Sequence, residues 1–206
     1  VRGLRAPACF LPVALSGGLL RPSGAWGLAV ACAQPRRWHD AGRPLRVSVN
    51  LSPAELSGSH LAEILRRAVE ETGLPPALLE LEIPEGRLDD AATADALRQA
   101  AALGVTVAVD DVGTGAFALA RLERLPVHRL KIDRSLVEAI GRSRERETLV
   151  RAIVGLGRNF GKRVVAEGVE TRSQLAFLLA NGCDEGQGWL WSRPVVAEEL
   201  GRRLAA

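Results

Sequence analysis

Side chains that can bind metal ions recur at the ends of short apolar segments in this sequence. Glu82 lies near the end of one segment, and Asp110 and Asp111 directly follow the run 105–109. Glu167 follows a further segment in the same way. Carboxylates that converge on one place repel one another, and hard divalent cations relieve this repulsion. The pattern therefore predicts a metal site that could bind a phosphodiester and activate water.

The other polar residues at the segment ends add oxygen or nitrogen atoms but no thiolate or imidazole. Asn50 ends the first segment, Lys131 and Asp133 belong to the fourth, and Gln187 precedes the last. Oxygen ligands alone favour Mg²⁺, Mn²⁺ or Ca²⁺ over Zn²⁺. The cysteines and histidines are too scattered for a zinc site or a disulfide framework. They are Cys9, Cys32 and Cys183, and His39, His60 and His128.

Each of these polar residues has a simpler explanation when it is taken alone. Glu82 alternates with Glu80 along its segment, as on a solvent-facing strand. Asn50 could form a turn, and Lys131 could be an ion-pair partner. The adjacent aspartates could cap the turn that follows them, although two acids after an apolar strand are costly without counter-charge. Repetition of polar residues at the segment ends favours a common site.

The apolar segments alternate with longer amphipathic stretches, which is the pattern of repeated β-α units and predicts an α/β fold. The run 105–109 is rich in β-branched residues, as in a parallel strand covered on both faces. Gly104 and Gly161 follow predicted helices, where glycine readily ends a helix, whereas Pro35 should kink one or cost about 3 kcal/mol. The carboxyl ends of parallel strands share one edge, so the polar residues should meet there. We predict strands at 45–51, 78–83, 105–110, 129–132, 163–166 and 188–191, and helices at 24–40, 60–70, 90–103, 117–124, 144–160, 172–180 and 197–204.

The bulk properties are those of one soluble globular domain. The chain has 206 residues and a net charge of +3, which is too small to indicate binding to DNA or RNA. We find no Gly-rich phosphate loop, no signal peptide and no apolar run long enough to span a membrane. We therefore expect a cytoplasmic protein with reduced thiols, either alone or as part of a larger membrane-attached or sensory protein.

The order of motifs along the chain resembles that of the EAL domain family of cyclic di-GMP phosphodiesterases. The resemblance covers nearly all of the chain, and the linked motifs together are far more specific than any one of them. It identifies residues 1–206 as one EAL domain that begins after the first strands of the family. The motifs are Val47–Pro53, Leu79–Glu85, Asp110–Gly115, Leu130–Asp133, Val165–Thr171 and Gly182–Gly188.

The resemblance implies a modified TIM-type (β/α)₈ barrel, with about six of the eight strands in this chain. It implies hydrolysis of cyclic di-GMP to linear pGpG with a pair of Mg²⁺ or Mn²⁺ ions. It also assigns roles to individual residues. Glu167 would be the general base, and Lys131 would hold the attacking water or a phosphate oxygen. Glu85 and Glu170 would steady the metal-binding loop, and Asp133 and Gln187 would lie near substrate or metal. The implied metal ligands are Asn50, Glu82, Asp110, Asp111 and Glu167.

The chain departs from the family pattern at several positions. Pro84 stands where threonine is usual, Val112 where phenylalanine is usual, and Trp189 where tyrosine is usual. Leu15 stands where an acidic residue is common. The Glu-Ala-Leu triplet that names the family does not occur in the chain, and with it a metal-binding glutamate is missing. We therefore expect weak or no hydrolysis by this chain alone.

These departures leave two alternatives to an active phosphodiesterase. The chain could be a catalytically impaired EAL module that binds cyclic di-GMP or a protein partner in bacterial second-messenger signalling. It could also be a non-functional fragment that folds poorly. An open barrel exposes sheet edges that invite pairing with another chain, so a homodimer is a further open alternative.

Overall fold

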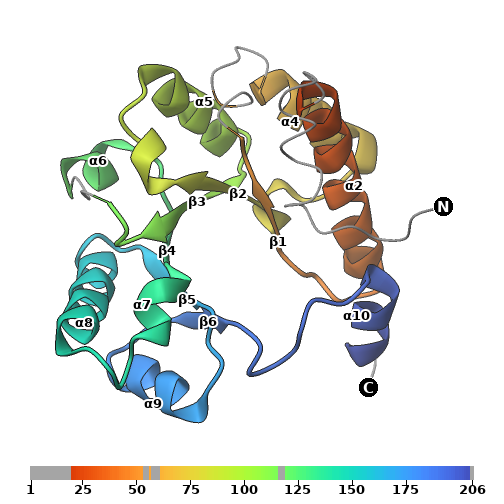
Figure 1. Cartoon of the computed structure of the whole chain (residues 1–206). Helices are drawn as coiled ribbons and strands as arrows, with labels where there is room; N and C mark the ends of the chain where they lie inside the picture. Colours follow the sequence, from red (N-terminus) through yellow and green to blue (C-terminus); the bar gives the residue numbers. More distant parts are fainter. Residues whose placement is uncertain (1–19, 53–55, 57–60, 116–118, 205–206) are drawn as a thin grey trace.

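The computed structural model describes residues 20–52, 56, 61–115 and 119–204. Cys9, Leu15 and His60, considered above, lie outside these ranges. The described part contains six strands, all parallel, which pair in the order of the sequence. The sheet curls into part of a barrel (Figure 1). The predicted α/β class is therefore confirmed. The strands are β1 (Val47–Asn50), β2 (Leu79–Pro84), β3 (Thr106–Val112), β4 (Arg129–Ile132), β5 (Arg163–Glu167) and β6 (Glu185–Gln187).

The helices lie around the outside of the curled sheet (Figure 1). The short helix α10 lies beside α2, where a Cβ at Gly201 would be 3.5 Å from the indole nitrogen of Trp38. None of the helices in the described ranges is long and apolar enough to cross a membrane. The helices are α2 (Leu20–Asp40), α4 (Leu61–Thr72), α5 (Ala91–Ala102), α6 (Leu119–Arg124), α7 (Arg134–Glu138), α8 (Arg144–Asn159), α9 (Arg172–Ala180) and α10 (Ala197–Arg203), with 3-10 turns η1 (Pro76–Leu78) and η2 (Glu85–Arg87).

Alternation along the strands separates the apolar core from a polar concave face. Leu79, Leu81 and Ile83 of β2 are fully buried and belong to the hydrophobic core. Glu80 and Glu82 lie between them and point to the other side of the sheet, because successive side chains of a strand alternate. In β4, Arg129 and Lys131 likewise alternate with the buried Leu130 and Ile132. The helices thus cover only the convex face, and charged side chains line the concave one.

The structure corrects three details of the predicted elements. The last strand is Glu185–Gln187, whereas the predicted segment 188–191 forms a turn. The apolar side chains of 188–191 suggested a strand. The strand β6 is polar instead, because Glu185 and Gln187 face the concave side of the sheet. Helix α7 was not predicted, because it has only a single turn. Helix α2 continues through Pro35 without interruption.

The His128 side chain, just before β4, contacts the backbone of β3 and should make stability depend on pH. Its Nδ1 accepts a hydrogen bond from the backbone N–H of Val107 at 3.1 Å, which requires the neutral imidazole. Partial burial is the main cause that lowers the pKa of His128 below its usual value of 6.5. The positive charges of Lys162 and Arg46 lower it further, whereas the negative charge of Glu80 opposes the shift. The neutral form is thus favoured in the folded protein, so its stabilisation is complete above about pH 6.5 and is lost as the pH falls below it. Because His128 is exposed and water competes for this hydrogen bond, we expect a loss of less than about 1 kcal/mol, the value of one typical hydrogen bond.

The measurement is urea unfolding between roughly pH 5 and 7.5, the range in which histidine titrates. His128→Asn is the matched variant, because its side-chain oxygen can accept the same hydrogen bond and does not titrate. The difference in unfolding free energy between wild type and variant should change across this range. An unchanged difference would show that His128 does not cause the pH dependence.

Candidate functional site

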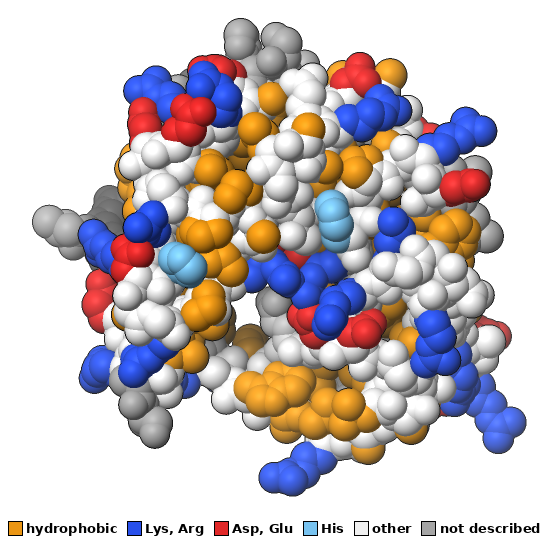
Figure 2. Space-filling model, turned by 180° about the vertical axis from the view of Figure 1, so that it is seen from behind, with side chains coloured by type: hydrophobic (Ala, Val, Ile, Leu, Met, Phe, Trp, Pro, Cys, Tyr) orange, Lys and Arg blue, Asp and Glu red, His pale blue; other side chains and the backbone are white. Residues whose placement is uncertain are grey.

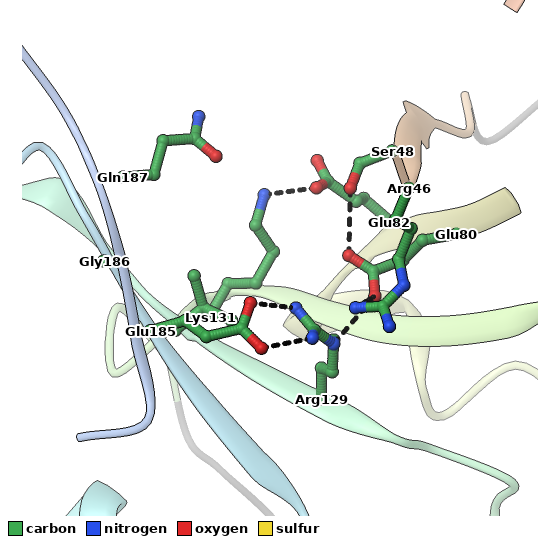
Figure 3. A pocket seen from close by; sticks show the side chains of 10 residues that line it. Arg46, Ser48, Glu80, Glu82, Arg129, Lys131, Glu185, Gly186 and Gln187 are labelled. Carbon is green, nitrogen blue, oxygen red and sulfur yellow. Dashed lines mark hydrogen bonds and ion pairs between the residues drawn. The ribbon is translucent and has the colours of Figure 1, made fainter. Parts of the chain in front are cut away.

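The Lys131 ammonium lies among three carboxylates from three other strands. Its Nζ is 2.5 Å from Glu82 Oε1, 2.5 Å from Glu167 Oε1 and 3.5 Å from Asp110 Oδ1. Figure 3 shows Lys131 and Glu82 facing each other across the pocket. The structure therefore brings these predicted residues together at the carboxyl ends of β2, β3, β4 and β5. Glu82 is buried, so its interpretation as a surface carboxylate is wrong.

The surroundings of this cluster control its charges. Burial alone would lower the pKa of Lys131, but hydrogen bonds and ion pairs with Glu167 and Glu82 raise it, so the side chain stays protonated. Burial raises the pKa of Glu167, which outweighs the opposite effect of Lys131. One ammonium group thus neutralises only part of the negative charge that faces it.

The two adjacent aspartates form a β-bulge. Val109 and Val112 of β3 pair with Leu130 and Ile132 of β4, so two residues on β3 occupy the space of one on β4. Asp111 has φ of 57°, the left-handed conformation, which non-glycine residues adopt at a cost. Burial, together with the nearby Asp110 and Asp133, raises the pKa of Asp111. The bulge keeps both carboxylates near the site, which an alternating strand would not do.

Glu85 anchors the loop that follows the aspartates. Its Oε2 accepts a hydrogen bond from the Gly113 N–H at 3.0 Å, although the two residues are far apart in sequence. Its Oε1 is buried and has no hydrogen-bond partner among the described residues. A Cβ at Gly115 would lie 3.3 Å from this oxygen, so a glycine there allows the close approach. The turn is thus held by Glu85 and not by the side chains of the aspartates.

The remaining predicted residues divide into two groups. Asn50 pairs with Glu82 in the β1–β2 register, and Gln187 pairs with Glu167 in the β5–β6 register, so both belong to the cluster's edge. Figure 3 shows the Gln187 amide and the Lys131 side chain lining the same pocket. Asp133 instead caps α7 by accepting a hydrogen bond from Ser135 N. Glu170 forms an ion pair with Arg134 at 3.1 Å.

The loop after Glu167 is locked against the end of β6. Val169 N donates to Gln187 O, and Leu190 N donates to Val169 O, both at 3.0 Å. A Cβ at Gly188 would lie 2.1 Å from Val169 O, so only glycine permits this contact. The turn at 188–191 therefore helps to position Glu167, and this explains why the segment does not form a strand.

A second row of charges lies one step below the site on the same face. We call Glu80, Arg129 and Glu185 the basal ion row. Arg129 and Glu80 are buried, and Arg129 forms ion pairs with Glu80 and with Glu185. On the side of the molecule seen in Figure 2, Lys and Arg side chains gather with Asp and Glu side chains beside a central hollow. Sequence reasoning missed this row, although polar residues at every second position of buried strands are its signal.

The chemistry of the donor atoms fits a hard divalent cation. The candidate ligands offer only carboxylate and amide oxygens, and Asp110 Oδ1 is buried without a hydrogen bond among the described residues. As it stands, no group of three or more His, Cys, Asp and Glu side chains in the described ranges is arranged to hold a metal ion. The Lys131 ammonium lies between the carboxylates instead. A bound cation and Lys131 would therefore both neutralise the negative charge of these carboxylates.

A family model described as "EAL domain" matches residues 1–194. MucR of Pseudomonas aeruginosa, named a bifunctional diguanylate cyclase/cyclic di-GMP phosphodiesterase, is 40% identical over 201 residues, which cover 96% of this chain and 29% of MucR. The cyclic di-GMP phosphodiesterase NbdA of the same organism is 39% identical over 208 residues, which cover 100% of this chain and 27% of NbdA. The chain thus spans about a quarter to a third of the length of these relatives.

Solved structures share the fold. A structure described as the PaMucR phosphodiesterase in complex with c-di-GMP matches with a TM-score of 0.92 and 40% identity, and the match covers 97% of this chain and 82% of that one. The EAL domain of Mycobacterium smegmatis DcpA matches with a TM-score of 0.82 and 39% identity, over 88% and 83% of the two chains. The curled sheet described above is thus the barrel-type sheet of these structures.

Proposed function

The chain belongs to the EAL domain family, and we propose that its site hydrolyses cyclic di-GMP to the linear dinucleotide pGpG when the glutamate of the absent Glu-Ala-Leu triplet is supplied, with weak or no turnover by this chain alone. The observation that carries this proposal is the cluster of Glu82, Asp110, Lys131 and Glu167 at the carboxyl ends of four neighbouring strands. Proteins named cyclic di-GMP phosphodiesterases are similar over nearly the whole chain, which supports the same substrate.

The ligand set favours Mg²⁺ or Mn²⁺ as the cofactor, because all the donors are hard oxygen atoms. When bound, the cations would polarise the phosphodiester and lower the pKa of a water molecule. Asn50, Glu82, Asp110, Asp111 and Glu167 would hold them.

The other side chains of the cluster have roles that follow from their contacts. Glu167 is partly exposed, and burial raises its pKa, which favours uptake of a proton and makes it the candidate general base. Lys131 remains protonated and can donate hydrogen bonds to a phosphate oxygen. Glu85 keeps the aspartates in place through the Gly113 N–H.

The test measures metal binding by calorimetry, and hydrolysis of cyclic di-GMP with Mg²⁺ or Mn²⁺ by this chain and by a longer form that carries the Glu-Ala-Leu segment. Asp110→Ala removes a carboxylate of the cluster, so we expect it to lose both metal affinity and turnover. Asp95→Ala is the matched control, because Asp95 is exposed on α5 and its ion pair with Arg98 lies on that helix. Equal metal affinity in wild type and Asp110→Ala would refute the assigned site, and nucleotide binding without hydrolysis would indicate a binding module.

A further inference from the structure

Arg129 connects three strands through its guanidinium group. Its Nη1 donates to Glu185 Oε2 at 2.6 Å, and its Nη2 donates to Glu185 Oε1, so this pair is bidentate. Its Nε lies 3.2 Å from Glu80 Oε2. Figure 3 shows Arg129 between the two carboxylates, with Glu185 on one side and Glu80 on the other. Strand β4 is thus joined directly to β2 and β6, neither of which is its neighbour in the sheet.

The contact between Arg129 and Glu80 is buried, so it can fix the relative positions of the strands. The side chains of Arg129 and Glu80 are only 8% and 3% exposed, whereas that of Glu185 is 36% exposed and also lies 3.5 Å from Arg163. Glu80 Oε1 also accepts a hydrogen bond from Ser48 on β1, at 2.9 Å. Ala108 pairs with Arg129 in the β3–β4 register, and its side chain ends at Cβ, so the longer guanidinium side chain can reach across β3. A buried bidentate arginine holds its partners at fixed positions, unlike a mobile surface pair.

The basal ion row repeats the candidate site at a spacing of two residues. Glu80 precedes Glu82, Arg129 precedes Lys131, and Glu185 precedes Gln187, each on the same strand and the same face. Residues two apart along a strand are about 6.6 Å apart. Any change in the separation of the strands at the lower row is therefore passed to the upper row.

From this arrangement we infer that Arg129 is a positioning residue for the metal site. It acts as a permanent internal cation that holds β2, β4 and β6 at the separation at which Glu82, Lys131 and Gln187 can act together. This inference rests on the proposed function, because it assumes that the upper cluster binds metal. It assigns to the lower row no contact with substrate or metal.

A positioning role of Arg129 and an electrostatic effect of its positive charge predict opposite changes in metal affinity. A positive charge near a cation site opposes cation binding, so removal of Arg129 on electrostatic grounds alone should tighten metal binding. A positioning role predicts the opposite, because the strands lose their connection. Arg129→Lys sharpens the contrast, since it keeps the charge but cannot form the bidentate pair.

The central experiment uses Glu80→Gln/Arg129→Met, which removes one negative and one positive charge. Arg129→Met alone would leave the buried Glu80 carboxylate without its partner, which destabilises the fold. The double variant removes that carboxylate as well, so it should fold even if Arg129→Met alone does not. The matched control is Arg66→Met/Glu70→Gln, which removes an exposed ion pair of the same type from α4. Mn²⁺ affinity is measured by calorimetry at a temperature at which circular dichroism shows every variant folded. The Mn²⁺ electron paramagnetic resonance spectrum reports the geometry of the bound ion.

We expect about tenfold weaker Mn²⁺ affinity in the double variant, the low end of the range for residues behind metal ligands. Arg129→Lys should weaken binding in the same direction, the resonance spectrum should broaden in both, and the control should bind as wild type does. Wild-type affinity and spectrum in the folded double variant would overturn the positioning role while leaving the proposed function intact. Absence of Mn²⁺ binding by wild type would overturn both.

Discussion

In a longer form of the protein that carries the Glu-Ala-Leu segment, replacing Glu167 by glutamine is expected to slow hydrolysis of cyclic di-GMP by about 10²- to 10⁴-fold, the usual contribution of a general base. The carboxylate ends β5, lies 2.5 Å from Lys131, and has a raised pKa because it is partly buried. Glutamine has nearly the same shape but cannot accept the proton. The loop at Val169 and Gly188 holds the backbone independently of this side chain, so the fold should be unchanged.

The decisive comparison is the turnover number at saturating nucleotide, together with nucleotide affinity and thermal unfolding. Glu145→Gln is the control, because Glu145 is an exposed glutamate in the first turn of α8. A large loss of turnover with wild-type unfolding would support the role of Glu167 as base. Turnover within a few-fold of wild type would show that Glu167 only supports the structure.

Replacing Lys131 by methionine is expected to destabilise the metal-free protein by about 3 to 5 kcal/mol, the cost of removing one partner from a buried ion pair. Glu82 and Lys131 have side chains only 6% and 5% exposed, so their charges are poorly screened by water. Without the ammonium, Glu82, Asp110 and Glu167 face one another uncompensated. A bound divalent cation should restore much of this stability, since it supplies the missing positive charge.

Urea unfolding in EDTA and in excess Mn²⁺ measures this effect. The gain in unfolding free energy from Mn²⁺ should be larger in Lys131→Met than in wild type, while hydrolysis stays low because the phosphate contact is lost. Lys162→Met serves as the control, because that lysine lies outside the cluster and is only partly buried. The same gain in both proteins would contradict the idea that Lys131 and the cation neutralise the same carboxylates.

Local patterns were sufficient to predict the fold class and most strands and helices. Gly104 and Gly161, predicted at helix ends, have φ of 84° and 63°, which suits glycine. Parallel β-α units also imply that the strand ends share one edge, and Glu82, Asp110, Lys131 and Glu167 do meet there. These features follow from short-range spacing, so the sequence alone could predict them.

Other features depend on contacts between residues far apart in the chain, and only the tertiary structure decided them. The bulge that leaves Asp111 left-handed depends on the register of β3 against β4. The placement of the last strand at 185–187 depends on Val169, which lies against Gly188. Arg129 and Glu185 are separated by 56 positions, and nothing local to either indicates their pairing. The sequence by itself determined which residues could do chemistry, whereas the curvature of the sheet decided which of them face one another, because curvature arises from packing across the whole fold.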